Sequence, residues 1–269
     1  MPQKMEQVGF VGCGEMGSMV LTAALQAGVL DPARTVVAER NPDQRTKLSG
    51  LGVQLVEFPA ELGQCDQIIL AVRPQQFAEA VAEIGADDHG RLVISVMAGI
   101  GSNTIQTAFG ENTRVICVMP NAPVRVHAGM CALMPASQAT DEDIAFGQAL
   151  FGTLGKTVIL PESNLWAVTA LSGSGPGYLA LIAETMVEHA IEMGIDPDVA
   201  PILVAETMAG TGRMLAETGM TPARLRAAVA TPGGTTEAAI NSMIDEGVQQ
   251  SIRRGIQAAH DRGETLSGG

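Results

Sequence analysis

The segment Gly12-Cys13-Gly14-Glu15-Met16-Gly17 decides the fold of this chain. It fits the pattern G-x-G-x-x-G, and it lies between an apolar run, Val8–Val11, and a stretch of helical composition, Met16–Ala27. A buried strand, a glycine-rich turn and a helix in this order are typical of a dinucleotide-binding unit. The alternative interpretation is a glycine-rich turn that joins a strand to a helix and binds nothing.

Each glycine of this turn has its own expected role. Gly12 permits the tight turn, Gly14 lets a pyrophosphate approach the backbone, and Gly17 lets the helix pack closely against the strand. The free amides and the dipole at the helix start then hold the phosphate. The cofactor contacts that we predict from this turn are Gly12, Gly14, Glu15, Met16 and Gly17.

Short apolar runs alternate with helical stretches through the first part of the chain. The expected strands are Val8–Val11, Thr35–Glu39, Gln67–Val72, Leu92–Val96, Val115–Met119 and Thr157–Leu160. The expected helices are Met16–Ala27, Pro42–Gly50, Gln75–Ile84 and Thr104–Phe109. This alternation predicts a doubly wound parallel sheet of the Rossmann type with helices on both faces.

After Leu160 the pattern indicates helices alone. The helical stretches are Leu165–Leu171, Pro176–Met193, Pro197–Glu217, Pro222–Val229, Thr235–Asp245 and Val248–Arg262. We expect a dinucleotide-binding domain over residues 1–161 and an all-helical domain over residues 162–269. The segment Pro197–Met214 is apolar on more than one face, so we also expect an obligate oligomer formed mainly through the helical half.

Composition narrows the class of protein. The chain has 269 residues, of which 46% are hydrophobic and 17% charged, which is enough apolar material for a sizeable core. Its formal net charge of -13 should repel nucleic acid and anionic membrane surfaces. No apolar run approaches the ~20 residues of a membrane span, and Met1–Glu6 lacks the apolar region of a signal peptide. We expect a cytoplasmic protein without a metal site, since the four cysteines form no C-x-x-C pair and the histidines are scattered.

Two residues at the end of the second expected strand give conflicting signals about the dinucleotide. Glu39 lies where an acid would bind the ribose 2′-hydroxyl of NAD, whereas Arg40 would suit the 2′-phosphate of NADP. Glu39 could instead be a solvated strand end, and Arg40 could stack on adenine. Two further strand ends, Ala71-Val72-Arg73-Pro74-Gln75 and Ser95-Val96-Met97-Ala98-Gly99, should reach the same crevice.

Two glycine-rich segments stand out in the helical half. Ser172-Gly173-Ser174-Gly175-Pro176-Gly177-Tyr178 and Thr231-Pro232-Gly233-Gly234-Thr235-Thr236 each supply small residues and free amides just before a helix. Amides at a helix start suit a carboxylate, and the threonine hydroxyls can exchange hydrogen bonds with a ligand. The alternative is a pair of helix caps with nothing bound.

These motifs occur in the same order as in the pyrroline-5-carboxylate reductases, which the chain resembles over residues 8 to about 262. The matching segments are the glycine turn, Ala71–Gln75, Met119-Pro120-Asn121-Ala122-Pro123, Ser172–Tyr178 and Pro232–Thr236. The resemblance implies a Rossmann domain, a helical dimerisation domain and larger ring-like assemblies of dimers. It also implies reduction of 1-pyrroline-5-carboxylate to proline, with NADPH as the cofactor and NADH as the alternative.

The resemblance implies roles for individual residues. Thr231, Gly233, Gly234 and Thr235 would line the substrate carboxylate pocket. Thr236 would place its hydroxyl near the ring nitrogen, and Glu217 matches an acidic residue near the active site, so these two are the expected catalytic residues. The cofactor contacts expected outside the glycine turn are Arg40, Val72, Arg73, Pro74, Ala98 and Asn121.

Departures from the family pattern leave alternatives open. Cys117 and Ala122 stand where the family usually has Arg and Thr, which leaves room for a related cyclic imine such as piperideine carboxylate. A β-hydroxyacid dehydrogenase would place a catalytic Lys within Tyr178–Met193, which contains none. A non-catalytic nucleotide-binding sensor could share the fold. Because neither glycine-rich segment contains His or Lys, we expect the substrate to bind as its iminium or to be protonated through water.

Overall fold

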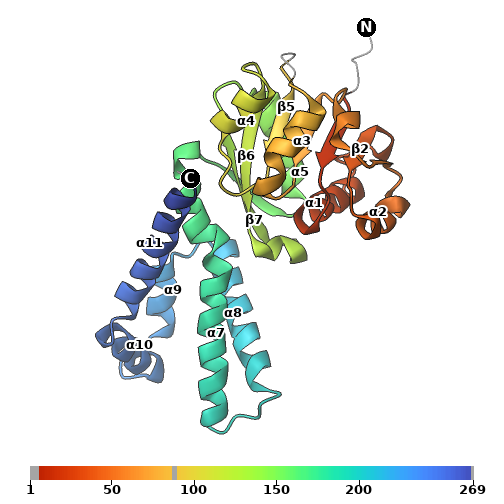
Figure 1. Ribbon diagram of the computed structural model, residues 1–269. Coiled ribbons are helices and arrows are strands. Elements are labelled where there is room, and N and C mark those ends of the chain that lie inside the picture. The colour runs from red at the N-terminus through yellow and green to blue at the C-terminus, as the bar shows by residue number, and fades with distance from the viewer. Residues whose placement is uncertain (1–5, 87–89, 268–269) are drawn as a thin grey trace. The chain divides into compact units, whose positions relative to one another are not determined.

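The computed structural model describes residues 6–86 and 90–267 of the chain. The chain divides into two compact units, one comprising Met1–Gly173 with His260–Gly269 and the other Ser174–Ala259. The first unit is built on a sheet and the second is helical, as the ribbon in Figure 1 shows.

The first unit contains an eight-stranded sheet with the strand order β3-β2-β1-β4-β5-β6-β7-β8. The strands are β1 (Val8–Val11), β2 (Thr35–Ala38), β3 (Gln54–Val56), β4 (Gln67–Leu70), β5 (Leu92–Ser95), β6 (Arg114–Pro120), β7 (Gly129–Pro135) and β8 (Gly155–Ile159). The order reverses at β1, which pairs with β2 on one side and with β4 on the other. Open α/β sheets bind their ligands at such a reversal, beyond the carboxyl ends of the strands.

Helices cover both faces of this sheet (Figure 1). One face packs against α1 (Glu15–Gln26), α2 (Pro42–Leu48) and α5 (Asp141–Gly152), and the other against α3 (Phe77–Ile84) and α4 (Ser102–Phe109). Successive strand residues alternate between the two apolar cores, so that Phe10 joins the first and Val11 the second. Both are almost fully buried, and burying such a side chain contributes roughly 1.5–3 kcal/mol.

The sequence patterns do not predict three elements of this unit, namely β3, β7 and α5. β3 has only three residues and begins with the exposed Gln54, so it offers no apolar run. β7 reads Gly-Met-Cys-Ala-Leu-Met-Pro and lacks the β-branched residues that mark strands. α5 does carry a start signal, because Thr140 and Asp143 form a capping box.

One pair of strands departs from the parallel arrangement. β6 and β7 are antiparallel, whereas the other neighbouring strands pair in parallel. The connection between them, residues 121–128, is too short for the crossover that a parallel pair requires. The expected Rossmann-type sheet is therefore confirmed as the dominant arrangement, with this pair as an exception.

The rest of the described chain is helical. α6 (Leu165–Val168) and a π-helical turn, Thr169–Gly173, complete this part of the first unit. The helices that follow are α7 (Gly175–Glu192), α8 (Ala200–Glu217), α9 (Pro222–Val229), α10 (Thr235–Asp245) and α11 (Val248–Ser267). Pro176 lies in the first turn of α7 and Pro222 begins α9, positions where the missing amide hydrogen costs little.

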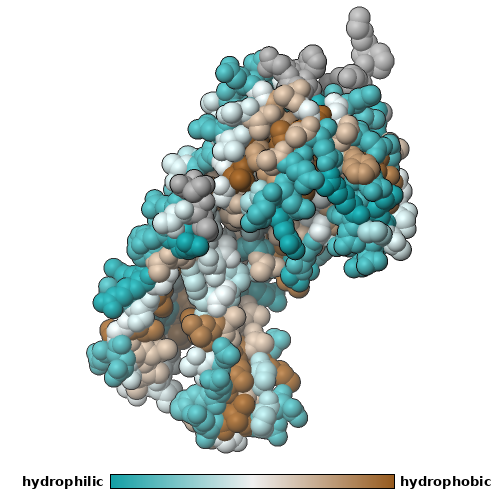
Figure 2. Space-filling view, viewed as in Figure 1, coloured by the Kyte–Doolittle hydropathy of each residue, from teal (hydrophilic) through white to brown (hydrophobic). Residues whose placement is uncertain are grey.

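α7 and α8 pack against each other and leave many apolar side chains exposed. Leu181 on α7 is 63% exposed and Ile202 on α8 is 62% exposed. Figure 2 shows apolar surface on the helical unit. Apolar faces of this extent are typical of surfaces that another subunit covers, in line with the expected oligomer.

One helical stretch, Glu162–Glu192, is long and apolar enough to pass a simple test for a membrane span. Only 6% of its most apolar window is buried. Gly, Ser, Thr and Glu residues interrupt its apolar positions, so the sequence shows no continuous apolar run there. A single helix of this kind gives weak support for a membrane, because an apolar helix that contacts another subunit has the same composition.

Candidate functional site

A cavity of about 300 Å³ opens where β1, β2 and β4 end. This is the reversal point of the sheet, so the cavity lies where the topology predicts a ligand. Of the predicted cofactor contacts, the lining contains Gly12, Gly14, Arg40, Val72 and Arg73. The structure therefore brings together residues from three separate strand ends that the sequence predicts as one site.

The glycine turn has the geometry that a bound pyrophosphate requires. Gly12 has a φ of 79°, and a Cβ there would lie 2.7 Å from Val72 Cγ1. A Cβ at Gly17 would lie 2.6 Å from the Gly12 carbonyl oxygen, so α1 can approach β1 only with glycine here. Gly14 differs, because a Cβ there would meet no atom within 4 Å. The open side of Gly14 lines the cavity, so the turn fits a dinucleotide phosphate.

Glu39 ties this turn to the end of β2. Its carboxylate accepts a hydrogen bond from the Cys13 amide at 2.7 Å and another from the Asn41 amide at 2.8 Å. Burial, with a smaller contribution from Glu39, raises the pKa of the Cys13 thiol to about 12. Cys13 is therefore a neutral packing thiol, and Glu39 has a structural role besides the ribose contact that the sequence suggests.

The two arginines of the lining differ in which of their groups has a partner: the guanidinium in Arg40 and the backbone amide in Arg73. Arg40 forms ion pairs with Glu79 and Glu83 of α3. Arg73 follows β4, and its backbone amide donates to Gln76 Oε1 at 3.2 Å. The sequence motifs do not identify Gln76 and Glu79 as cavity residues, although both follow the recognised Ala71–Gln75 segment closely.

The other predicted cofactor residues lie outside the lining of this cavity. The Glu15 carboxylate pairs with Arg125, and Met16 packs against the core beside α1. Asn121 accepts a hydrogen bond from the Met130 amide at 2.8 Å and donates to Ser172 Oγ at 3.4 Å. The remaining residues of this group are Gly17, where a Cβ would meet the Gly12 carbonyl, Pro74, which begins a 3₁₀ turn, and Ala98, which lies in the turn after β5.

Glu162 forms a clamp that the sequence does not reveal. Its carboxylate accepts from the Ser102 amide at 2.6 Å and from the Ser102 hydroxyl, at the first residue of α4. Cys117 Sγ donates to Glu162 Oε1 at 3.7 Å. Burial, followed by the charge of Glu162, raises the pKa of the Cys117 thiol, so it stays protonated as a donor. The clamp joins residues that lie 60 and 45 positions apart in the chain.

The predicted substrate segment forms a tight turn at the start of α10. Gly233 has a φ of 72°, and the Gly234 amide donates to the Thr231 carbonyl at 2.9 Å. The Gly233 amide donates to Glu237 Oε2 at 2.7 Å. A carboxylate of the chain itself thus binds one of the amides that we predict for the substrate carboxylate.

The two expected catalytic residues also lie in the helical unit. Thr236 is half-buried in the first turn of α10, and its hydroxyl makes no hydrogen bond among the described residues. Glu217 ends α8 and pairs with Arg213 at 3.2 Å on an exposed helix face. The hydroxyl of Thr236 is therefore available to a ligand, whereas Glu217 already has a partner.

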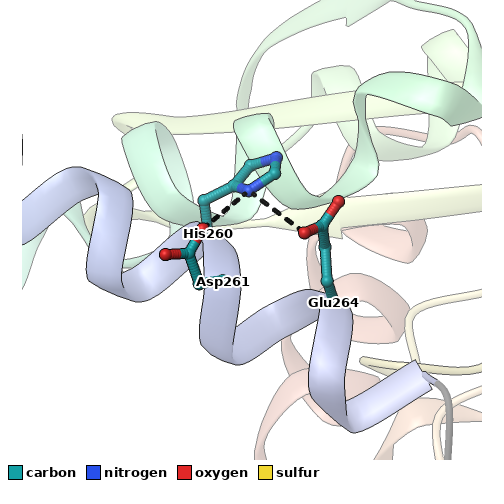
Figure 3. A group of neighbouring side chains, drawn as sticks. All are labelled: His260, Asp261 and Glu264. Atoms are coloured by element: carbon teal, nitrogen blue, oxygen red, sulfur yellow. Dashed lines mark ion pairs between the residues drawn. The ribbon is translucent and has the colours of Figure 1, made fainter.

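Three ionisable residues gather near the end of α11 (Figure 3). His260 Nδ1 lies 3.7 Å from Asp261 Oδ1 and 3.8 Å from Glu264 Oε2. One nitrogen and two exposed carboxylates at this spacing are typical of ion pairs on a helix surface. We assign them no role in the site.

The strand order, the glycine turn and the cavity define a Rossmann-type dinucleotide-binding protein with an added helical unit. The family pattern for pyrroline-5-carboxylate reductase dimerisation matches residues 162–266. The pattern described as NADP oxidoreductase, coenzyme F420-dependent, matches residues 7–99. The second match includes the glycine turn and the five parallel strands β1 to β5, and the first match includes the Thr231–Thr236 turn.

Relatives are similar over nearly the whole chain. Pyrroline-5-carboxylate reductase 2 of Bacillus subtilis is 34% identical over 96% of this chain and 94% of its own. The pyrroline-5-carboxylate reductase of Thermus thermophilus is 35% identical over 97% and 98%. A solved pyrroline-5-carboxylate reductase structure from Coxiella burnetii is 28% identical and has a TM-score of 0.92, covering 97% of this chain and 98% of that one. The chain therefore belongs to the pyrroline-5-carboxylate reductase family.

Proposed function

We propose that this chain reduces 1-pyrroline-5-carboxylate to proline by hydride transfer from NAD(P)H. The observation that carries the proposal is similarity over nearly the full length to several reductases of that name, at 34% and 35% identity for two of them. The cavity at the strand ends and the amide-rich turn before α10 supply the two sites that such a reaction needs.

The dinucleotide would be held by the glycine turn and the neighbouring strand ends. Gly14 lines the cavity at the start of α1, where the helix dipole favours phosphate, while the Gly12 amide donates to the Ala38 carbonyl at 2.9 Å and so fixes the turn. Arg73 adds a positive charge at the end of β4. The nicotinamide, when bound, supplies the hydride.

The substrate carboxylate would bind the amides of Gly233 and Thr235 in a pocket lined by Gly234 and Thr231, whose amide and carbonyl close the turn. Binding there displaces Glu237 from the Gly233 amide, because one amide hydrogen cannot serve two carboxylates fully. The Thr236 hydroxyl then orients the ring nitrogen. Since neither glycine-rich segment offers His or Lys, the nitrogen arrives protonated as the iminium or receives its proton through water.

The charge near the bound substrate depends on Glu217. By the family resemblance Glu217 lies near the active site, where its carboxylate, once released from Arg213, would favour a cationic iminium over a neutral imine. The match to a dimerisation family over residues 162–266 supports a homodimer through this region. Rings of such dimers are the larger assembly that we propose from the family resemblance. We place the boundary between the cofactor and helical domains near residue 161, and we place the protein in the cytoplasm, consistent with four free cysteines.

Steady-state assays with purified protein test the proposal. Absorbance follows oxidation of NADPH and NADH with 1-pyrroline-5-carboxylate, and chromatography measures proline. Piperideine carboxylate, assayed in parallel, is the competing substrate that Cys117 and Ala122 leave open. Faster turnover of the five-membered imine supports the proposal. Turnover of the six-membered imine alone would replace it, and dinucleotide binding without turnover of either would favour a sensor.

A further inference from the structure

The guanidinium group of Arg40 is held between two carboxylates of α3. Arg40 Nη1 lies 2.7 Å from Glu79 Oε1, and Nη2 pairs with Glu83 Oε1. Arg40 Cζ also lies 5.7 Å from the centroid of the Phe58 ring, which favours a fixed position for the cation. Because Arg40 and Glu79 both line the cavity at the strand ends, this arrangement is part of the dinucleotide site.

Arg40 is the residue that would bind a ribose 2′-phosphate, since it follows directly on the acid at the end of β2. A phosphate monoester carries about two negative charges and is bound best by a guanidinium that offers two parallel N–H groups. In Arg40 both terminal nitrogens already donate to carboxylates. Because the guanidinium has further N–H groups, a 2′-phosphate either shares Arg40 with Glu79 and Glu83 or displaces them, and in both cases these carboxylates weaken its binding.

Glu83 makes this displacement unfavourable. Its Oε2 atom is buried and accepts no hydrogen bond among the described residues. The pairing of its other oxygen with Arg40 is thus the contact that offsets the partial removal of this carboxylate from water. If Arg40 turned toward a phosphate, the Glu83 carboxylate would lose that partner.

The carboxylates that line the cavity also disfavour a 2′-phosphate. Three carboxylates, from Glu39, Glu57 and Glu79, face the same cavity as the guanidinium groups of Arg40 and Arg73. A dinucleotide without a 2′-phosphate introduces less negative charge into this surrounding. Its ribose 2′-hydroxyl can also donate to a carboxylate, which a phosphate cannot do.

We propose that Glu79 and Glu83 are specificity-determining residues that compete with the 2′-phosphate of NADPH for Arg40, and so shift the preference of this chain toward NADH. The inference rests on the proposed function in one respect, namely that this cavity binds a nicotinamide dinucleotide. It concerns the ratio of the two affinities, because Arg40 remains able to bind a 2′-phosphate at the cost of its ion pairs.

Calorimetric titration of the full-length protein with NADP⁺ and with NAD⁺ tests the inference without relying on turnover. In the double variant Glu79→Gln with Glu83→Gln, the ratio of Kd for NAD⁺ to Kd for NADP⁺ should rise about tenfold, and about threefold in either single variant. Glu57→Gln is the matched control, because Glu57 lines the same cavity but pairs with Arg45 at 3.5 Å. It makes the same change of charge and should alter the ratio less than about twofold.

The Arg40→Gln background separates competition from simple repulsion. There the two α3 substitutions should change the ratio less than about threefold, because no guanidinium remains to be released. A full tenfold change in that background, or an equal change in Glu57→Gln, overturns the competition. So does an unchanged ratio in folded variants that bind both dinucleotides. Failure of the unaltered protein to bind either dinucleotide overturns the proposed cofactor site itself, and this inference with it.

Discussion

Replacing Gly14 with Ala should weaken dinucleotide binding and leave the fold intact, whereas the same change at Gly17 should destabilise the fold. The two glycines belong to one turn, but their surroundings differ. At Gly14 the φ of -63° suits Ala, and a Cβ would meet no atom within 4 Å. At Gly17 a Cβ would lie 2.6 Å from the Gly12 carbonyl oxygen and 3.0 Å from Ala71 Cβ.

These distances set the expected magnitudes. Ala at a position with compatible backbone angles stabilises a protein by ~0.4–1 kcal/mol, so the free energy of unfolding of Gly14→Ala should change by no more than about 1 kcal/mol. Its methyl group would project into the cavity where the pyrophosphate approaches, which should raise Kd about 10- to 100-fold, or about 1.4–2.8 kcal/mol. Gly17→Ala overpacks the contact between α1 and β1, which should lower the free energy of unfolding by ~1–3 kcal/mol.

Urea unfolding measures the stability of both variants, and calorimetric titration with NADP⁺ and NAD⁺ measures their affinity. Gly14→Ala should keep its free energy of unfolding within about 1 kcal/mol of the unaltered protein and bind both dinucleotides more weakly to a similar degree, since the pyrophosphate is common to them. If this variant binds both with the Kd of the unaltered protein, the close approach of phosphate to the backbone at Gly14 is refuted.

Three further predictions concern other parts of the molecule. Thr236→Ala should lower kcat/KM roughly 10–1,000-fold without altering urea unfolding, the scale of one lost transition-state hydrogen bond; unchanged kinetics would remove Thr236 from the mechanism. Glu162→Ala should lower the free energy of unfolding by ~0.5–2 kcal/mol through loss of the α4 cap, and an unaltered urea midpoint would contradict this. The pKa of the Cys13 thiol is raised from 9.0 to about 12 in the folded chain. The unfolded chain therefore binds fewer protons across that window, and stability should fall as pH rises through it, less steeply in Cys13→Ala; equal slopes by urea unfolding would refute the assignment.

The features of the fold and site that the sequence predicts are those whose motif lies within one short segment of the chain. The glycine turn is recognisable because strand, glycines and helix occur within one short segment, residues 8–27. The amide-rich turn before α10 is recognisable for the same reason. β7 and β3 escape prediction because sheet pairing, and not residue preference, stabilises them.

The parts that the sequence does not predict depend on contacts between distant residues. Arg40 meets Glu79 and Glu83, which lie 39 and 43 positions later, only because β2 and α3 are brought together by the strand order. The bond from the Ser102 amide to Glu162 spans 60 positions. The bond from Gly233 to Glu237 spans four and could have been expected from a capping pattern.

The most direct test of the account uses a reduced dinucleotide that carries deuterium at the transferable position of the nicotinamide. Purified protein is incubated with this cofactor and 1-pyrroline-5-carboxylate, and mass spectrometry locates the label in the product. The account predicts proline with one deuterium on the ring CH₂ carbon bonded to the nitrogen, which is the carbon of the former C=N bond, and none on the carbon that bears the carboxylate. Unlabelled proline, or no proline at all from protein that binds the dinucleotide, would contradict it.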